Sequence, residues 1–338
     1  MKIGVLGAGT WGMALSALLS KNGHDVTVWS ALQNEIDYLK KTNTHKNLKG
    51  ITFPESIKYT TDIEEAAADA ELVLFVVASS YIRKTARDAA RYIKDGTILV
   101  SAAKGIESGT LITMTDIIEQ EVLSCGDKQR CRVAALSGPT HAEEVAAGLP
   151  TSIVSACEDE QTSRIIANVF SSSCMRVYMN TDVLGVELGG ALKNIVALAC
   201  GINRGMGFGD NASAALMTRG AAEITRIGLA MGANLKTFLG LAGIGDLIVT
   251  CTSEHSRNNR CGKLIGLGKS YEEALAEIGM VVEGYHALGA AMELSKKHGV
   301  EMPITEAVYN IIHNGLTPKE AMVALMGRDI KNELNIQS

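Results

Sequence analysis

The sequence lacks the features that would place it among nucleic-acid-binding, secreted or membrane-spanning proteins. Lys and Arg number 32 against 37 Asp and Glu, so there is no basic surplus to neutralise nucleic-acid phosphates, and a small-molecule substrate is expected. The seven cysteines are odd in number and never spaced as Cys-x-x-Cys, which predicts free thiols. The N-terminus shows no secretory signal, and the longest apolar stretch, residues 184–202, is interrupted by Glu187, Lys193 and Asn194. We therefore expect a cytoplasmic protein that neither binds nucleic acid nor inserts into a membrane.

The chain has two halves with different residue patterns and no Pro-rich or Ser-rich linker between them. Up to about residue 180, short β-branched runs alternate with helical patterns, which is typical of βαβ units and a parallel sheet. Strands are expected at residues 2–6, 25–29, 72–77, 97–101, 133–136, 152–155 and 176–178. After about residue 182, small, apolar and charged residues recur at helical spacing. The prediction is an α/β domain with a doubly wound, mostly parallel sheet over residues 1–180, followed by an all-α domain over residues 181–338.

A G-x-G-x-x-G pattern lies between the first expected strand and an apolar helical segment. Gly7 allows a tight turn, Gly9 lets the backbone approach a pyrophosphate, and Gly12 lets the helix pack against the strand. Free N–H groups at the start of the helix would then face the phosphates. Glycine in an ordinary strand-to-helix turn is the alternative, but the order of strand, pattern and helix favours a dinucleotide site.

The end of the second expected strand normally distinguishes NAD from NADP, through an acid for the ribose 2′-hydroxyl or an arginine for a 2′-phosphate. Here the sequence reads Trp29-Ser30-Ala31, which offers neither. Ser30 could reach either form of the cofactor, so the preference between NAD and NADP is undecided. Glu35 and Lys40 are expected on a solvated helix face.

Two further segments leave expected strands, where ligands of doubly wound folds bind. Lys104 could meet a substrate phosphate or hydroxyl, or be a solvated lysine before a turn. In the second segment, Gly138 shapes a turn and Thr140 is placed to cap the following helix. The Thr140 hydroxyl and nearby N–H groups could hold a phosphate or the nicotinamide, and a structural cap is the alternative. His141 is interpreted as a surface histidine.

The helical half carries polar groups in apolar surroundings. Lys193 lies among small and apolar residues, and such an environment favours the neutral amine that a general base needs; a snorkelling lysine is the alternative. Asp246, in a Gly-rich bend, could bind a substrate hydroxyl, orient the lysine or cap a helix. In the loop that follows, Arg257 suits a bidentate grip on phosphate, with Ser256 and Asn258 at the remaining oxygens. A loose polar loop is the alternative for this last segment.

Taken together, these segments resemble the bacterial NAD(P)-dependent glycerol-3-phosphate dehydrogenase family essentially from end to end. The matching stretches include GAGTWG, AAKGIE, SGPTHAEEVAAGLPT, GVELGGALKNIVALACGI, LAGIGDLIVTCTSEHSRNNRCG and VVEGYHA. The resemblance implies a dinucleotide-binding Rossmann domain followed by a helical substrate and catalytic domain. It also implies hydride transfer between C2 of sn-glycerol 3-phosphate and C4 of the nicotinamide, which supplies phospholipid synthesis. The nicotinamide supplies the hydride, so no metal is expected.

The resemblance further assigns residue roles. Lys193 would be the proton acceptor, with Lys104 and Asp246 completing the catalytic set. Substrate contacts are expected from Lys104, Gly138, Thr140, Lys193, Asp246, Ser256, Arg257 and Asn258. Cofactor contacts are expected from Thr10, Trp11, Lys104, Ala142, Arg257, Val281 and Glu283. The residue patterns described above add Gly7, Gly9, Gly12 and Ser30 to this cofactor set.

One departure and two rival interpretations bear on these expectations. Members of the family usually carry Arg or His at the position of Ala31, and its absence here makes NAD more plausible. A 3-hydroxyacid or 6-phosphogluconate type dehydrogenase shares the two-domain plan, but the SRNNR loop and the VVEG segment favour glycerol 3-phosphate. A non-catalytic dinucleotide sensor has no need of Lys193 and Asp246. The oligomeric state is left open, with a homodimer as the working assumption.

Overall fold

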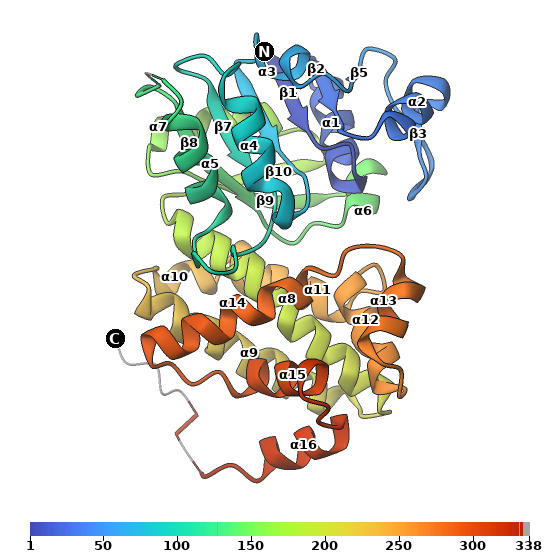
Figure 1. The fold of residues 1–338 in the computed structure, drawn as a ribbon, viewed down its shortest axis with the longest axis vertical. Coiled ribbons are helices and arrows are strands. Elements are labelled where there is room, and N and C mark those ends of the chain that lie inside the picture. The colour runs from blue at the N-terminus through green and yellow to red at the C-terminus, as the bar shows by residue number, and fades with distance from the viewer. Residues whose placement is uncertain (127, 331, 334–338) are drawn as a thin grey trace. The chain divides into compact units, whose positions relative to one another are not determined.

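The chain divides into two compact units in the computed structural model, which describes residues 1–126, 128–330, 332 and 333 (Figure 1). The first unit comprises residues 1–104 and 112–183, and the second comprises residues 105–111 and those from 184 onward. The segment 105–111 therefore groups with the helical unit, although sheet residues flank it in the sequence.

The first unit is built on an eight-stranded sheet with the order β10-β9-β8-β7-β6-β1-β2-β5. The strands are β1 (Lys2–Leu6), β2 (Asp25–Trp29), β5 (Lys58–Thr60), β6 (Leu72–Phe75), β7 (Ile98–Ser101), β8 (Arg132–Ser137), β9 (Thr151–Ala156) and β10 (Met175–Asn180). Every pair is parallel except β8 with β9. A separate two-stranded hairpin pairs β3 (Thr44–His45) with β4 (Leu48–Thr52). The predicted fold class, a mostly parallel Rossmann-like sheet followed by helices, is confirmed.

Helices cover both faces of this sheet. They are α1 (Thr10–Lys21), α2 (Gln33–Thr42), α3 (Ile63–Ala67), the short η1 (Ser79–Tyr81), α4 (Ile82–Ala90), α5 (Met114–Leu123), α6 (Ala142–Ala146) and α7 (Glu160–Phe170). Successive side chains of a strand point to opposite faces, so neighbours in the central strands enter different cores. Val5 and Leu74 pack in the cluster that includes α1 and α7, whereas Leu6 and Phe75 pack in the cluster of α4 and α5. Burial on both faces explains why these strands read as continuous apolar runs.

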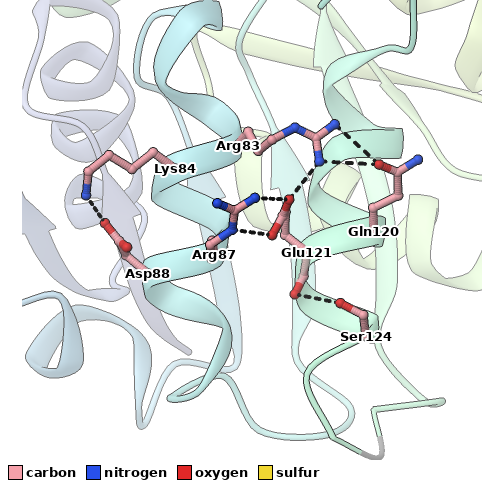
Figure 2. A network of polar contacts seen from close by, with 7 residues as sticks. All are labelled: Arg83, Lys84, Arg87, Asp88, Gln120, Glu121 and Ser124. Atoms are coloured by element: carbon pink, nitrogen blue, oxygen red, sulfur yellow. Dashed lines mark hydrogen bonds and ion pairs between the residues drawn. The ribbon is translucent and has the colours of Figure 1, made fainter. Parts of the chain in front are cut away.

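A charged network joins α4 to α5 (Figure 2). The Glu121 carboxylate accepts from Arg83 Nη1 at 2.7 Å and from Arg87 Nε and Nη2, both at 2.9 Å. Hydrogen bonds from Arg87 and then Arg83 lower the pKa of Glu121 to about 2. Only 13% of the Glu121 side chain is exposed, so this carboxylate fixes the two helices more firmly than the exposed Lys84–Asp88 pair on α4 can.

In the described part of the second unit, every regular element is helical. The elements are α8 (Val183–Gly205), α9 (Asp210–Ala230), α10 (Leu235–Phe238), η2 (Leu241–Gly245), α11 (Asp246–Thr252), α12 (Arg257–Gly266), α13 (Tyr271–Ile278), α14 (Glu283–His298), α15 (Pro303–His313) and α16 (Pro318–Met326). By length and composition α8 could cross a membrane, but 89% of its most apolar window is buried inside the protein. It is the core helix about which the second unit is packed.

Glycines set α12 close against α8. A Cβ added at Gly201 would lie 2.1 Å from the Asn259 carbonyl oxygen, and one added at Gly262 would lie 2.2 Å from the Leu198 carbonyl oxygen. Neither position can hold a side chain without separating the two helices. The close approach brings polar residues at the start of α12 to the middle of α8.

Candidate active site

A buried lysine–aspartate pair lies at the centre of the candidate active site. Lys193 Nζ on α8 donates to Asp246 Oδ1 at the start of α11, and to Thr250 Oγ1 at 2.6 Å. Lys193 is 5% exposed and Asp246 is 0% exposed. An ion without water costs several kcal/mol unless an opposite charge and hydrogen bonds compensate it. Each ion therefore fixes the other, and the snorkelling alternative for Lys193 is wrong.

The Gly-rich bend before α11 makes this pair possible. Residues 241–245 form one π-helical turn, η2, which delivers Asp246 as the first residue of α11. A Cβ added at Gly189 of α8 would lie 2.5 Å from the Ala242 carbonyl oxygen, so only glycine allows the bend to approach α8 this closely. The Asp246 carboxylate contacts the lysine, as one of its three alternatives expected, and the helix-cap alternative is wrong because Gly245 occupies the N-cap position.

Thr250 completes the lysine's surroundings and was not predicted. Its hydroxyl donates to the Asp246 carbonyl oxygen at 2.6 Å and accepts from Lys193 Nζ. The available signal was its spacing, because a residue four positions after Asp246 lies on the same face of a helix. Lys193 Nζ is thus held from two sides.

A second polar group ties the start of α12 to α8 and α14. Asn258 Nδ2 donates to Asn194 Oδ1 at 3.0 Å, and Asn258 Oδ1 accepts from the Gly284 N–H at 2.9 Å. Both asparagines are buried, at 8% and 6% exposed. Asn194 follows Lys193 in α8, so this network fixes the helix beside the lysine.

The segment around Arg257 is ordered by its own hydrogen bonds, so the loose-loop alternative is wrong. Ser256 is buried and accepts from the Asn259 N–H at 3.2 Å, which caps α12. Arg257 Nη1 donates to the Val281 carbonyl oxygen at 3.1 Å, two residues before Glu283 begins α14. The structure therefore brings together Arg257 and the segment expected to contact the cofactor. A guanidinium has five N–H donors, so Arg257 can bind an anion while it holds this contact.

In the first unit, the glycine loop between β1 and α1 fits a dinucleotide. Gly7 has φ +133°, and a Cβ there would lie 2.8 Å from the Val76 carbonyl carbon. A Cβ at Gly12 would lie 2.0 Å from the Gly7 carbonyl oxygen, whereas nothing lies within 4 Å of one at Gly9. The loop is therefore closed at its two outer glycines and open at the middle one. Gly9 is the N-cap of α1 and has no side chain that could accept from the first N–H groups of the helix. The N–H groups of Thr10 and Trp11 therefore lie next to the open space at Gly9, where a phosphate could accept from them.

Two side chains, one from the segment after β7 and one from the segment after β8, contact the same backbone carbonyl oxygen. Lys104 Nζ and Thr140 Oγ1 each lie 3.2 Å from the Gly138 carbonyl oxygen. Because β7 and β8 are parallel neighbours, their carboxyl ends share one sheet edge. The expectation that Thr140 caps the next helix is wrong: His141 occupies the N-cap of α6, and Ala142 is its first residue.

Ser30 forms a hydrogen bond with the carboxylate of Glu35, a residue that was expected on a solvated helix face. Its hydroxyl donates to Glu35 Oε2 at 2.5 Å, and Ser30 is 5% exposed. Glu35 is half-buried in the first turn of α2, so its expected place on a solvated face is wrong, while Lys40 is exposed as expected.

A cavity of about 1190 Å³ in the helical unit includes none of these residues. It is lined in part by Arg219, Glu223 and Arg226. Glu223 is 2% exposed and accepts from the N–H groups of Ile304 and Thr305 at 2.7 and 3.2 Å. Burial raises the pKa of Glu223 to about 7. These bonds give the carboxylate a structural role at the start of α15.

The sheet, the open glycine loop and the buried lysine define a dinucleotide-dependent oxidoreductase as the class of protein. The chain belongs to the NAD-dependent glycerol-3-phosphate dehydrogenase family: the models of its N-terminal and C-terminal parts match residues 2–163 and 182–323. The predicted resemblance is thereby confirmed, and the rival families are disfavoured.

Curated relatives and solved structures agree with this family. Glycerol-3-phosphate dehydrogenase [NAD(P)+] 2 of Lactobacillus delbrueckii subsp. bulgaricus is 55% identical over 98% of this chain and 99% of its own. Glycerol-3-phosphate dehydrogenase [NAD(P)+] of Agathobacter rectalis is 46% identical over 98% of this chain and 97% of its own. The crystal structure of glycerol-3-phosphate dehydrogenase from Coxiella burnetii matches with a TM-score of 0.91 and 35% identity, and covers 96% of this chain and 98% of that one.

Proposed function

We propose that the protein reduces dihydroxyacetone phosphate to sn-glycerol 3-phosphate with a reduced nicotinamide dinucleotide, and so supplies phospholipid synthesis. The observation that carries the proposal is the buried Lys193–Asp246 pair, held by Thr250, in a chain with an open dinucleotide loop. Relatives that bear this activity in their names match over nearly their whole length, which supports it. We further propose a cytoplasmic enzyme, and a homodimer as its assembly.

In this proposal the two units have different tasks, with the boundary near residue 180. The first unit holds the dinucleotide through its glycine loop and Ala142, and Lys104, Gly138 and Thr140 contact substrate. The second unit contributes Lys193, Asp246 and the Ser256–Asn258 segment to the substrate. Arg257 suits the substrate phosphate, because a guanidinium matches two phosphate oxygens at once. The cofactor would also meet Arg257 and the segment of Val281 and Glu283.

Proton transfer is assigned to Lys193. Reduction of a ketone places negative charge on the C2 oxygen, which needs a proton as the charge develops. The nicotinamide supplies the hydride. The Lys193 ammonium, stabilised by Asp246, is the form that donates to this oxygen, and the neutral amine takes the proton back in the oxidative direction. Asp246 and Thr250 fix the direction in which Nζ points, so the proton starts from a defined place.

Turnover measured with a matched lysine control tests this proposal. Absorbance of the reduced cofactor is followed after addition of dihydroxyacetone phosphate, with NADH and NADPH in parallel. Lys193→Met is expected to lower kcat by about 10²- to 10⁴-fold, the usual contribution of a general acid. Lys236→Met changes an exposed lysine of α10 and is expected to keep full activity. No turnover by folded wild-type protein with either cofactor would overturn the proposal.

A further inference from the structure

A hydroxyl–carboxylate pair stands where the second strand of the dinucleotide domain ends. Ser30 follows β2, and its N–H donates to the Thr60 carbonyl oxygen of β5 at 3.1 Å, so its backbone is part of the sheet. Its Oγ accepts from the Leu32 N–H at 3.2 Å and donates to Glu35 Oε2 at 2.5 Å. The Glu35 carboxylate is thereby drawn back from the first turn of α2 to the end of β2.

This position adjoins the glycine loop. Strands β1 and β2 are parallel neighbours with Leu6 opposite Trp29, and the Gly7 N–H donates to the Trp29 carbonyl oxygen at 2.9 Å. The loop and the Ser30–Glu35 pair therefore leave the same sheet edge, one strand apart. In dinucleotide-binding sheets the pyrophosphate lies at the first position and the adenosine ribose at the end of the second strand.

Charge at this position distinguishes the two forms of the cofactor. A carboxylate accepts a hydrogen bond from a ribose 2′-hydroxyl but repels a 2′-phosphate of like charge. Ala31, the next residue, has no charge with which to compensate that repulsion. The acid is present although the strand end itself reads Trp-Ser-Ala, because it comes from five residues further along the chain.

The imidazole of His45, which interacts electrostatically with Glu35, lies on the β3–β4 hairpin, and Asn47 of this hairpin donates through Nδ2 to Thr10 Oγ1, at the start of α1, at 3.2 Å. Burial lowers the pKa of the His45 imidazole and so favours its neutral form despite the charge of Glu35. Lys46 is exposed, and its Nζ lies 5.4 Å from the centre of the Tyr38 ring. The half-buried carboxylate is held in place by Ser30, whereas the Lys46 ammonium is exposed to solvent.

We propose that Glu35, held by Ser30, makes this chain select NAD(H) over NADP(H) by accepting the ribose 2′-hydroxyl. The assignment of a ribose to this sheet edge rests on the proposed function as a dinucleotide-dependent enzyme. Glu35 is the specificity-determining residue, and Ser30 is a positioning residue that acts through it.

Calorimetric titration with NADH and NADPH, without substrate, tests the proposal. Wild-type protein is expected to bind NADH at least about tenfold more tightly than NADPH, a difference of about 1.4 kcal/mol. Glu35→Gln keeps the size and removes the charge, so the ratio should fall below about threefold, mainly because NADPH binds more tightly. Asp37→Asn removes an exposed carboxylate from the same helix and should leave the ratio unchanged.

Equal or tighter binding of NADPH by wild-type protein would overturn the inference, and so would a ratio that Glu35→Gln does not change. A parallel assay of dihydroxyacetone phosphate reduction keeps this result distinct from the proposed function. Turnover without cofactor selectivity refutes only the role of Glu35. If Glu35→Gln abolishes the selectivity of cofactor binding but dihydroxyacetone phosphate is not reduced, the role of Glu35 is supported and the proposed substrate is refuted.

Discussion

Removal of one member of the buried ion pair should destabilise the helical unit strongly. Asp246 is 0% exposed. In Lys193→Met its carboxylate loses the ammonium group that compensates its charge. Breaking such a pair costs about 3–5 kcal/mol, because the remaining ion keeps its desolvation penalty. In a domain of this size each kcal/mol lowers Tm by about 2–4 °C, so the expected decrease is about 6–20 °C. Asp246→Asn should have an effect of the same order, since it isolates the lysine instead.

The double variant separates the charge effect from simple loss of packing. Lys193→Met with Asp246→Asn leaves no ion buried, so the two losses should not add, and a coupling of about 2–3 kcal/mol is expected. Urea unfolding followed by circular dichroism measures each free energy of unfolding. Lys58→Met, which removes an ion pair with Asp25 that is 64% and 45% exposed, should change it by less than about 1 kcal/mol. Losses that simply add in the double variant would refute the argument.

Three further predictions concern acid stability, neutral-pH stability and the glycine loop. The pKa of Glu121 is lowered from its ordinary value of 4.5 to about 2. The ionised carboxylate therefore stabilises the fold above pH 4.5, and this stabilisation is lost as the pH falls towards 2. Glu121→Gln should therefore cost about 2 kcal/mol at pH 7 and nothing near pH 2 in urea unfolding, and an equal cost at both pH values would contradict the network's role. The raised pKa of Glu223, about 7, predicts the opposite trend, because stability present below pH 4.5 is lost as pH rises through 7. Glu223→Gln should abolish that decline in the same measurement, and a variant that keeps it would exclude Glu223 as its cause. Gly12→Ala should weaken NADH binding at least tenfold in calorimetric titration, since its Cβ would lie 2.0 Å from the Gly7 oxygen; unchanged affinity would show that the loop is not the site.

Most strands of the large sheet could be predicted from the sequence, but the shortest strands could not. The predicted bounds of β1 and β2 match the structure, and those of the other predicted strands lie within two residues. The central strands among them, such as β1 and β6, are buried on both faces, which imposes an apolar run. By contrast, β5 has three residues and β3 has two, so neither shows a period in the sequence.

Residue types of the site could be predicted, while their partners could not. Lys193 and Asp246 were recognisable as charged residues in apolar segments of the sequence. Their contact was not predictable, because they lie 53 residues apart in the chain and meet only through the turn before α11. Glu35 was missed although it lies only five residues after Ser30 in the sequence. The usual pattern expects the acid at the end of the second strand itself, and here that position holds no acid. Thr140 was assigned a cap because its position relative to α6 is uncertain by one residue from sequence alone.

The apolar character of α8 and the chemistry of Lys193 have one cause. The same composition that makes α8 long and apolar enough to cross a membrane buries Lys193 in a protein core. A methionine there, together with an uncharged residue at position 246, would fill the space without any buried charge, so the fold does not need this ion pair for packing. The lysine requires Asp246, Thr250 and glycines that let the α11 bend approach α8. The proposed proton transfer would explain this arrangement, because it needs a lysine at a fixed point, which a solvated lysine could not provide with the same precision.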